Sequence, residues 1–391
     1  MIERDLADHL RELSRLYSVV TVTGPRQSGK TTLCRATFPR LSYVTLEPLD
    51  VREAAIQDPR GFLAEHQDGA IIDEVQRAPE LLSYLQAEID ERPAPGRFIL
   101  TGSQHLGLSA QISQSLAGRT GILELLPPSW RELQRFDNAP KDLFEVLWAG
   151  AYPRIFDRSI PPHQWLADYV ATYVQRDLRQ LLRVGDLRTF TDFLRLCAGR
   201  TAAEINLSAL GGDAGVSHNT ARAWLSVLEA SYLAIRLPAW HSNIKKQIVR
   251  APKLHFLDTG LVCYLLGIRE AEQLRHHPSR GAVFETWVAS EVYKQIVHRG
   301  ERPRLFHYRD AKGLEVDLVV EPSDGVILAE AKSGATVAGD FMRPVERLAD
   351  LVRRREKARD VTTRVVYGGD AAHTRLQTAI VPWAAVDRVK W

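Results

Sequence analysis

The feature that most constrains this chain is the segment GPRQSGKT at residues 24–31. It follows the apolar run 18–23, which we predict as a buried strand, and it leads into a predicted helix over 31–37. Glycines in such a loop let the backbone curl so that consecutive amide groups point at a phosphate, and the helix N-terminus adds a favourable dipole. A glycine loop without a ligand would not require this strand and helix context, so we expect a nucleotide-phosphate site.

A second pattern supplies the other half of this site. Residues 70–74 (AIIDE) are predicted as an apolar strand that ends in two carboxylates. Lys30 is expected to reach the terminal phosphates, while Thr31 and Asp73 bind magnesium. Glu74 is the expected catalytic residue, because a carboxylate there can polarise the attacking water. The alternative is a strand that ends in a solvated acidic turn.

A third apolar run, 98–104 (FILTGSQ), also ends in small polar residues. The carboxyl ends of parallel strands converge on one edge of a sheet, so Thr101, Ser103 or Gln104 could sense the terminal phosphate, with Ser103 as the first choice. Turn chemistry alone is the alternative. The expected cofactors are ATP and magnesium, and the expected contacts are Gly24, Pro25, Arg26, Gln27, Ser28, Gly29, Lys30, Thr31, Thr32, Asp73 and Ser103.

The pattern along the chain predicts more than one domain. Short apolar runs alternate with helical patterns in the first third, which indicates a parallel sheet covered on both faces. Residues 140–236 are mostly helical in pattern, and strands return at 304–308, 315–321 and 325–331, before a charged helix over 341–359 and a strand over 364–367.

Length and composition limit the number of domains and the class of protein. A length of 391 residues suggests two or three domains. The net charge of +3 is too small to argue for nucleic-acid binding by itself. The cysteines Cys34, Cys197 and Cys263 make neither a disulfide framework nor a zinc pattern, which fits a reducing compartment. Because no apolar run is long enough to span a bilayer, we expect a cytoplasmic protein with no membrane contact.

The order of these motifs, followed by 116–119 (LAGR) before a final strand, resembles an AAA+ ATPase. The resemblance implies that Arg119 is a catalytic arginine finger, which acts on the nucleotide of a neighbouring subunit. It therefore implies a homo-oligomer that depends on Arg119. A surface arginine at a helix C-terminus is the plainer interpretation. Whether Arg154 or Arg176 acts as a second nucleotide sensor stays open.

The resemblance extends over nearly the whole chain. Residues 150–153 (GAYP), 173–178 (YVQRDL) and 252–261 (PKLHFLDTGL) follow one another in the order typical of prokaryotic ATPases that pair an AAA+ core with a C-terminal domain of unknown function. Membership of that family would not by itself supply a biological role.

A helix-turn-helix is predicted in the middle section. A short helix at 207–210 is followed by a turn at 215–216, and Ser217 is a good N-cap for a second helix that runs through Leu228. With a wing over 231–238, this is a winged helix in outline. It could place its second helix in a DNA groove, with charge supplied by Lys245, Lys246, Arg250 and Lys253, or it could serve packing or protein contacts.

The C-terminal section carries an acidic and basic set that resembles the restriction-endonuclease-like nucleases. Asp317 lies on one predicted strand, and Glu330 and Lys332 share one face of the next. Glu285 matches the glutamate that these nucleases carry on a helix. The resemblance implies a metal held by Glu285, Asp317 and Glu330, with Lys332 as a catalytic residue that orients or deprotonates water. Alternatively, Glu330 and Lys332 form a solvated salt bridge.

The predicted fold class is α/β. It comprises a P-loop AAA+ parallel-sheet domain (1–155), a helical linker with a winged helix (156–245) and a restriction-endonuclease-like domain (246–391). The expected function is ATP binding and hydrolysis that control a DNA-binding or DNA-cleaving C-terminal domain. The alternatives are a nucleotide-dependent switch, in which an inactive nuclease-like domain binds a protein partner, and a transcription regulator that uses the winged helix alone.

Overall fold

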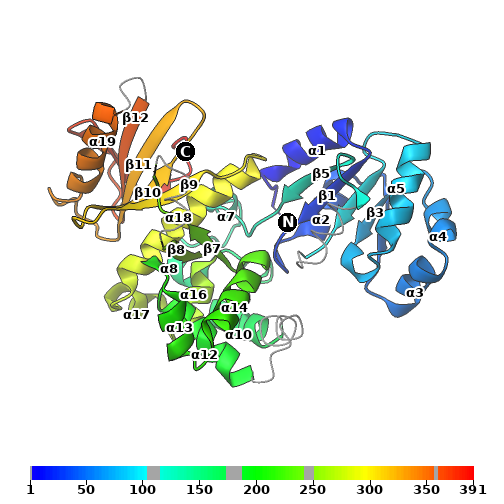
Figure 1. The fold of residues 1–391 in the computed structure, drawn as a ribbon, viewed down its shortest axis with the longest axis horizontal. Helices are drawn as coiled ribbons and strands as arrows, with labels where there is room; N and C mark the ends of the chain where they lie inside the picture. Colours follow the sequence, from blue (N-terminus) through cyan, green and yellow to red (C-terminus); the bar gives the residue numbers. More distant parts are fainter. Residues whose placement is uncertain (1, 104–114, 173–186, 242–250, 356–359) are drawn as a thin grey trace. The chain divides into compact units, whose positions relative to one another are not determined.

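The structure, a computed structural model, describes residues 2–103, 115–172, 187–241, 251–355 and 360–391. The chain forms two compact units. The first unit contains residues 1–127 with 230–232 and 297–301, and the second contains the rest of the chain. Figure 1 shows the elements of both units.

The first unit is built on a parallel sheet of five strands in the order β2-β3-β4-β1-β5 (Figure 1). The non-consecutive order places β1, which leads into the phosphate-binding loop, between β4 and β5. The helices and strands are α1 (Leu6–Leu16), β1 (Val19–Thr23), α2 (Lys30–Thr37), β2 (Ser42–Thr45), α3 (Leu49–Gln57), α4 (Pro59–Glu65), β3 (Ala70–Asp73), α5 (Leu81–Glu91), β4 (Phe98–Thr101) and β5 (Thr120–Glu124).

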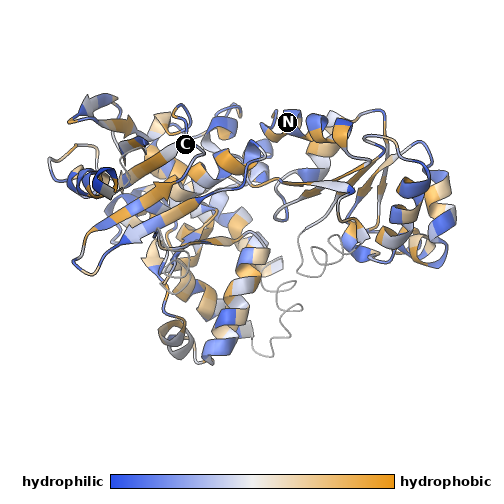
Figure 2. Ribbon diagram, turned by 45° about the horizontal axis from the view of Figure 1, so that its top comes forward, coloured by the Kyte–Doolittle hydropathy of each residue, from blue (hydrophilic) through white to orange (hydrophobic). Residues whose placement is uncertain are grey.

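Both faces of this sheet are buried, which explains why its strands are continuous apolar runs. Val20 and Val22 of β1 belong to one core cluster with Leu10 of α1. Val19 points to the opposite face and belongs to a second cluster with Leu85 of α5. Figure 2 shows the hydrophobic colour that results along these strands. The covered faces leave the carboxyl ends of the strands as the edge at which polar groups gather.

The second unit begins with helices and a small sheet of three strands in the order β6-β8-β7. Both neighbouring strand pairs are antiparallel. Its elements as far as residue 298 are α7 (Trp130–Leu133), α8 (Leu143–Ala149), α9 (Pro153–Asp157), α10 (Pro162–Tyr169), α12 (Leu187–Ala198), β6 (Ala203–Glu204), α13 (Leu207–Asp213), α14 (His218–Ala230), β7 (Ala234–Leu237), β8 (Lys253–Phe256), α16 (Thr259–Leu265), α17 (Ala271–His276) and α18 (Arg280–His298).

The predicted helix pair is present as α13 and α14. Trp224 and Leu228 of α14 are buried, whereas Asn219 and Arg222 are exposed. The predicted wing segment contains β7, which pairs with β8. One expectation is wrong: Lys253 is not a surface charge for DNA, because it lies in the fully buried strand β8.

The C-terminal part of the second unit is a six-stranded mixed sheet in the order β13-β14-β12-β11-β10-β9. Strands β9, β10 and β11 are antiparallel neighbours, and β12 is parallel to β11. Helix α19 packs on this sheet through one buried cluster that includes Val345 and Leu348. The elements are β9 (Leu305–Arg309), β10 (Glu315–Val320), β11 (Gly325–Lys332), α19 (Arg343–Arg355), β12 (Asp360–Tyr367), β13 (His373–Arg375) and β14 (Thr378–Pro382).

The predicted α/β class is confirmed, with a parallel sheet first, a helical middle and a separate mixed sheet last. The observed strands begin or end up to four residues from the predicted limits, because backbone hydrogen bonding and not apolar character sets where a strand ends. The three-domain division stays a prediction. Several residues of interest lie outside the described part of the chain: Gln104, the motif 173–178 with Arg176, and Lys245, Lys246 and Arg250. Within the described part, no helix has the length and apolar character needed to cross a bilayer.

Candidate functional site

The phosphate-binding loop curls between β1 and α2 as the sequence predicts. Gly24 has φ +143°, and a Cβ there would lie 2.1 Å from the carbonyl oxygen of Leu125, so only glycine fits. Gly29, with φ +95°, is the N-cap of α2. The Lys30 ammonium donates hydrogen bonds to the carbonyl oxygens of Gly24 (3.0 Å) and Pro25 (2.8 Å). Lys30 is therefore folded back onto its own loop and must leave these oxygens to reach a phosphate.

Asp73, at the end of β3, is the hydrogen-bonding centre of this edge. Thr31 at the start of α2 donates to both of its carboxylate oxygens at 3.0 Å. The Tyr43 hydroxyl donates to Oδ2 at 2.9 Å, and Thr101 donates to Oδ1. Burial and the neighbouring Asp73 charge raise the pKa of Tyr43 to about 12, so this hydroxyl keeps its proton at neutral pH.

Glu74 and Ser103 are linked through a residue that the sequence analysis did not select. The Gln76 amide donates to the Glu74 carboxylate and also to the Ser103 hydroxyl, at 3.1 Å. Glu74 itself has φ +58°, an unusual conformation for a residue with a side chain. Gln76 thus joins the expected catalytic base to the expected phosphate sensor, and Thr101, another candidate for the sensor, contacts Asp73.

Arg119 forms a two-pronged ion pair with Asp90 on α5. Its Nε and Nη2 atoms donate to the two Asp90 oxygens at 2.7 and 2.9 Å. The hydrogen bond from Arg119 lowers the pKa of Asp90. Exposed pairs of this kind contribute little to stability, so the contact could be exchanged for another anion at small cost. The arginine-finger role stays a prediction.

The residues at this edge fit a magnesium-bound nucleotide. Thr31 and Asp73 present hard oxygen donors 3.0 Å apart, and magnesium in nucleotide sites takes few protein ligands because phosphates and waters supply the rest. Thr31 and Asp73 would hold the ion, which supplies charge neutralisation for the phosphates. Lys30 would contact the terminal phosphates, and Glu74 would accept a proton from the attacking water. This arrangement is suited to hydrolysis of a nucleoside triphosphate.

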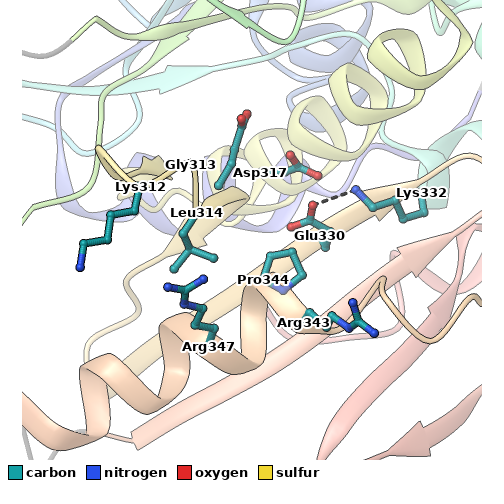
Figure 3. A pocket seen from close by; sticks show the side chains of 10 residues that line it. Lys312, Gly313, Leu314, Asp317, Glu330, Lys332, Arg343, Pro344 and Arg347 are labelled. Carbon is teal, nitrogen blue, oxygen red and sulfur yellow. Dashed lines mark hydrogen bonds and ion pairs between the residues drawn. The ribbon is translucent and has the colours of Figure 1, made fainter.

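The second unit brings together Asp317, Glu330 and Lys332, as the sequence predicts. The amide of Ala331 donates to Asp317 Oδ2 at 3.0 Å, which ties β10 to β11 at this point. A register irregularity between Val316 and Val319 lies at Asp317, and such bulges commonly redirect side chains at functional sites. Lys332 forms an ion pair with Glu330 at 2.8 Å (Figure 3).

These three side chains line a pocket of about 400 Å³. Arg343 and Arg347, from the first turns of α19, and Lys312 add positive charge to its wall (Figure 3). We call this the acid–lysine pocket; its lining is Lys312, Gly313, Leu314, Glu315, Asp317, Glu330, Lys332, Arg343, Pro344 and Arg347.

Lys253, on β8, contacts two acidic residues that line this pocket, Glu315 and Asp317, and also contacts Glu285 on α18. Its ammonium lies 2.7 Å from Glu315, 2.9 Å from Glu285 and 3.5 Å from Asp317. Only 2% of the Lys253 side chain is exposed. Burial alone would lower the pKa of Lys253, but the charges of Glu285 and Asp317 outweigh burial and raise it. A charged lysine therefore stands among these three carboxylates.

The pKa values of the neighbouring carboxyl groups shift in opposite directions. Burial, and then the Asp317 charge, raise the pKa of Glu285 and that of Glu330 to about 8. Burial also acts to raise the pKa of Glu315, but the hydrogen bond from Lys253 outweighs it and lowers that pKa. Glu330 Oε2 is buried and has no hydrogen-bond partner. Glu285 and Glu330 therefore hold a proton more readily than free glutamates do, whereas the contact with Lys253 keeps Glu315 ionised.

The metal site expected at Glu285, Asp317 and Glu330 does not fit this arrangement. Among the residues that the structure describes, no group of three or more histidine, cysteine or carboxylate side chains could hold a metal ion. The physical reason is that Lys253 contacts Glu285 and Asp317, while Glu330 is paired with Lys332.

Three known protein families match successive parts of the chain. The AAA domain family matches residues 17–134, a domain of unknown function (DUF8612) matches 140–272, and another (DUF4143) matches 280–386. Uncharacterized proteins of Mycobacterium bovis and Mycobacterium tuberculosis are each 31% identical over 329 residues, which cover 82% of this chain and 71% of theirs. The chain belongs to their family. It is a prokaryotic ATP-binding protein with an AAA+ core and a C-terminal domain of unknown function, as the sequence motifs indicated.

A solved structure is also similar to this AAA+ protein. A Walker-type ATPase of Pyrococcus abyssi is 16% identical, with a TM-score of 0.46 over 68% of this chain and 96% of that chain.

Because Lys30 is buried, we expect the affinity for ATP to depend on pH. Burial lowers the pKa of Lys30 to about 8, and phosphate binding requires the charged form. Binding must therefore take up a proton as the pH rises through this pKa. We expect ATP affinity to fall about tenfold between about pH 7 and pH 9, measured by calorimetry in two buffers that differ in heat of ionisation. Constant affinity with no proton uptake would contradict this assignment.

Proposed function

We propose that this AAA+ ATPase uses ATP binding and hydrolysis to control a C-terminal domain that binds the phosphate backbone of DNA. The observation that carries the proposal is the acid–lysine pocket, which four basic residues line together with Asp317 and Glu330. The ATPase part rests on the AAA domain match and on the geometry around Lys30 and Asp73.

The nucleotide site supports a role as the controlling element. Lys30 and Thr31 are both engaged within the site, the first with the loop and the second with Asp73. A bound nucleotide would replace these contacts, because Lys30 and the hydroxyl of Thr31 would turn to phosphate and to magnesium. Gln76 would carry the change to Glu74 and Ser103, since it contacts both.

The basic wall of the pocket supports a polyanionic ligand. Arg343 and Arg347 are exposed and lie one helical turn apart on α19, a spacing that puts both on one face of the helix. Guanidinium groups bind phosphates in a planar, two-pronged geometry, and such contacts supply most of the affinity of proteins for nucleic-acid backbones. The exposed Asn219 and Arg222 of α14 offer a second set of polar contacts.

The second candidate is a nucleotide-dependent switch whose C-terminal domain binds a protein partner. The observation in its favour is the occupation of Glu285 and Asp317 by Lys253, which leaves the nuclease-like residues without a metal-holding arrangement. This candidate predicts no DNA affinity through the pocket.

Salt dependence separates the two candidates. We expect the variant Arg343→Ala/Arg347→Ala to bind duplex DNA more weakly, with the slope of log affinity against log salt reduced by about 1 for each arginine, because each phosphate contact releases counterions. Fluorescence anisotropy over a salt series measures this slope. The matched control is Arg354→Ala, an exposed arginine on the same helix that does not line the pocket. Equal slopes in all three proteins, or no DNA binding, would favour the switch.

Arg119 provides a test of assembly. If it completes the nucleotide site of a neighbouring subunit, Arg119→Ala loses about 10³-fold in ATPase rate, and mixing it with Lys30→Ala restores part of the activity. Asp90→Ala, which removes the ion pair but keeps the arginine, should retain activity. Absence of any recovery on mixing, measured by phosphate release, would place Arg119 outside a shared site.

A further inference from the structure

Lys253 is buried among three carboxylates, which we call the acidic cluster, whereas an ordinary surface ion pair joins one cation to one anion in contact with water. Its ammonium contacts three carboxylates from two elements, Glu285 on α18 and Glu315 with Asp317 on β10. An ammonium has three donor hydrogens, so three carboxylate partners use its full capacity. The cluster is therefore complete without any further cation.

Strand β8 holds this lysine rigidly. Lys253 is the first residue of β8 and pairs with Leu237 of β7 and Glu204 of β6 in the small sheet. The four residues of β8 are all buried, so the lysine side chain has no route to solvent of the kind that surface lysines use. Removing a buried charge from its partners is costly, which keeps Lys253 in place once the fold has formed.

A divalent metal at this position would require the same oxygens. Magnesium and calcium need carboxylate oxygens about 2.0–2.6 Å from a common point, and they compete poorly with a fixed positive charge at that point. The ammonium of Lys253 already lies 2.7–3.5 Å from the oxygens of Glu285, Glu315 and Asp317. Glu330, the fourth acidic residue, is paired with Lys332.

We infer that Lys253 is a permanent internal cation of the acid–lysine pocket, which takes the place that a divalent metal would need. The inference deepens the proposed function: the pocket binds its phosphate ligand without a metal, and the domain does not perform metal-dependent cleavage at these residues. Lys253 acts as a positioning residue, because it fixes Glu285, Glu315 and Asp317 and leaves the outer basic side chains to meet the ligand.

Metal binding to the nucleotide-free, full-length protein tests this inference. Manganese is titrated by calorimetry into the wild type and into Asp317→Asn. We expect the two proteins to show the same response, because Asp317 is not a metal ligand when Lys253 is present. Manganese binding in the wild type that is lost in Asp317→Asn would overturn the inference.

Replacement of Lys253 tests the converse, that a metal site appears once its ammonium group is removed. Lys253→Met should gain a manganese site that binds at least about tenfold more tightly than any site of the wild type, and Lys253→Met/Asp317→Asn should lose it. Lys332→Met, which removes a lysine that lines the pocket but leaves Lys253, should gain none. A folded Lys253→Met protein that gains no site would contradict the assignment.

A charge-matched variant covers the case in which Lys253→Met does not fold. Lys253→Met/Glu285→Gln removes one positive and one negative group together and keeps the carboxylates of Glu315, Asp317 and Glu330. It should also gain manganese binding. These experiments need no DNA, so failure of the inference is distinct from failure of the DNA-binding proposal, which the salt series tests by itself.

Discussion

Buried charge is the constraint on which both units of this protein depend. A carboxylate or ammonium removed from water must be paired or fully hydrogen-bonded, and the surrounding elements are arranged to provide those partners. In the first unit the group is Asp73, which receives hydroxyl hydrogen bonds from Thr31, Tyr43 and Thr101 and so joins α2, β2 and β4 to the end of β3. In the second unit it is Lys253, which joins β8 to α18 and β10. Each group lies where its unit carries its proposed chemistry.

The Asp73 site and the Lys253 site differ in whether a ligand can replace the contacts within them. The contacts of Asp73 and Lys30 are made to groups that a nucleotide and its magnesium can replace, since hydroxyl and carbonyl partners are given up easily for phosphate and metal. The contacts of Lys253 are charge to charge and buried, so no small ligand replaces them at comparable cost. This difference fits the proposal that the first unit responds to a ligand, while Lys253 stays fixed in the second.

Sequence patterns predicted the backbone of both sites, because their motifs are local. The loop at 24–31, the strand that ends at Asp73, and the pair Glu330 and Lys332 all depend on spacing within a few residues. The partners that come from distant segments were missed. Tyr43 is half-exposed in a short strand, and Lys253 is separated from Asp317 by 64 residues. One local signal for Lys253 existed, a lysine at the start of a short strand with the apolar residues Leu254 and Phe256, but its partners follow only from the tertiary fold.

The central claim is that nucleotide at the Lys30 site controls DNA binding by the C-terminal domain. The most direct measurement is the affinity of the full-length protein for duplex DNA with and without ATP, in the wild type and in Lys30→Ala. The account predicts that ATP changes the affinity of the wild type and leaves that of Lys30→Ala unchanged. An ATP effect of equal size in both proteins, or none in the wild type, would contradict it.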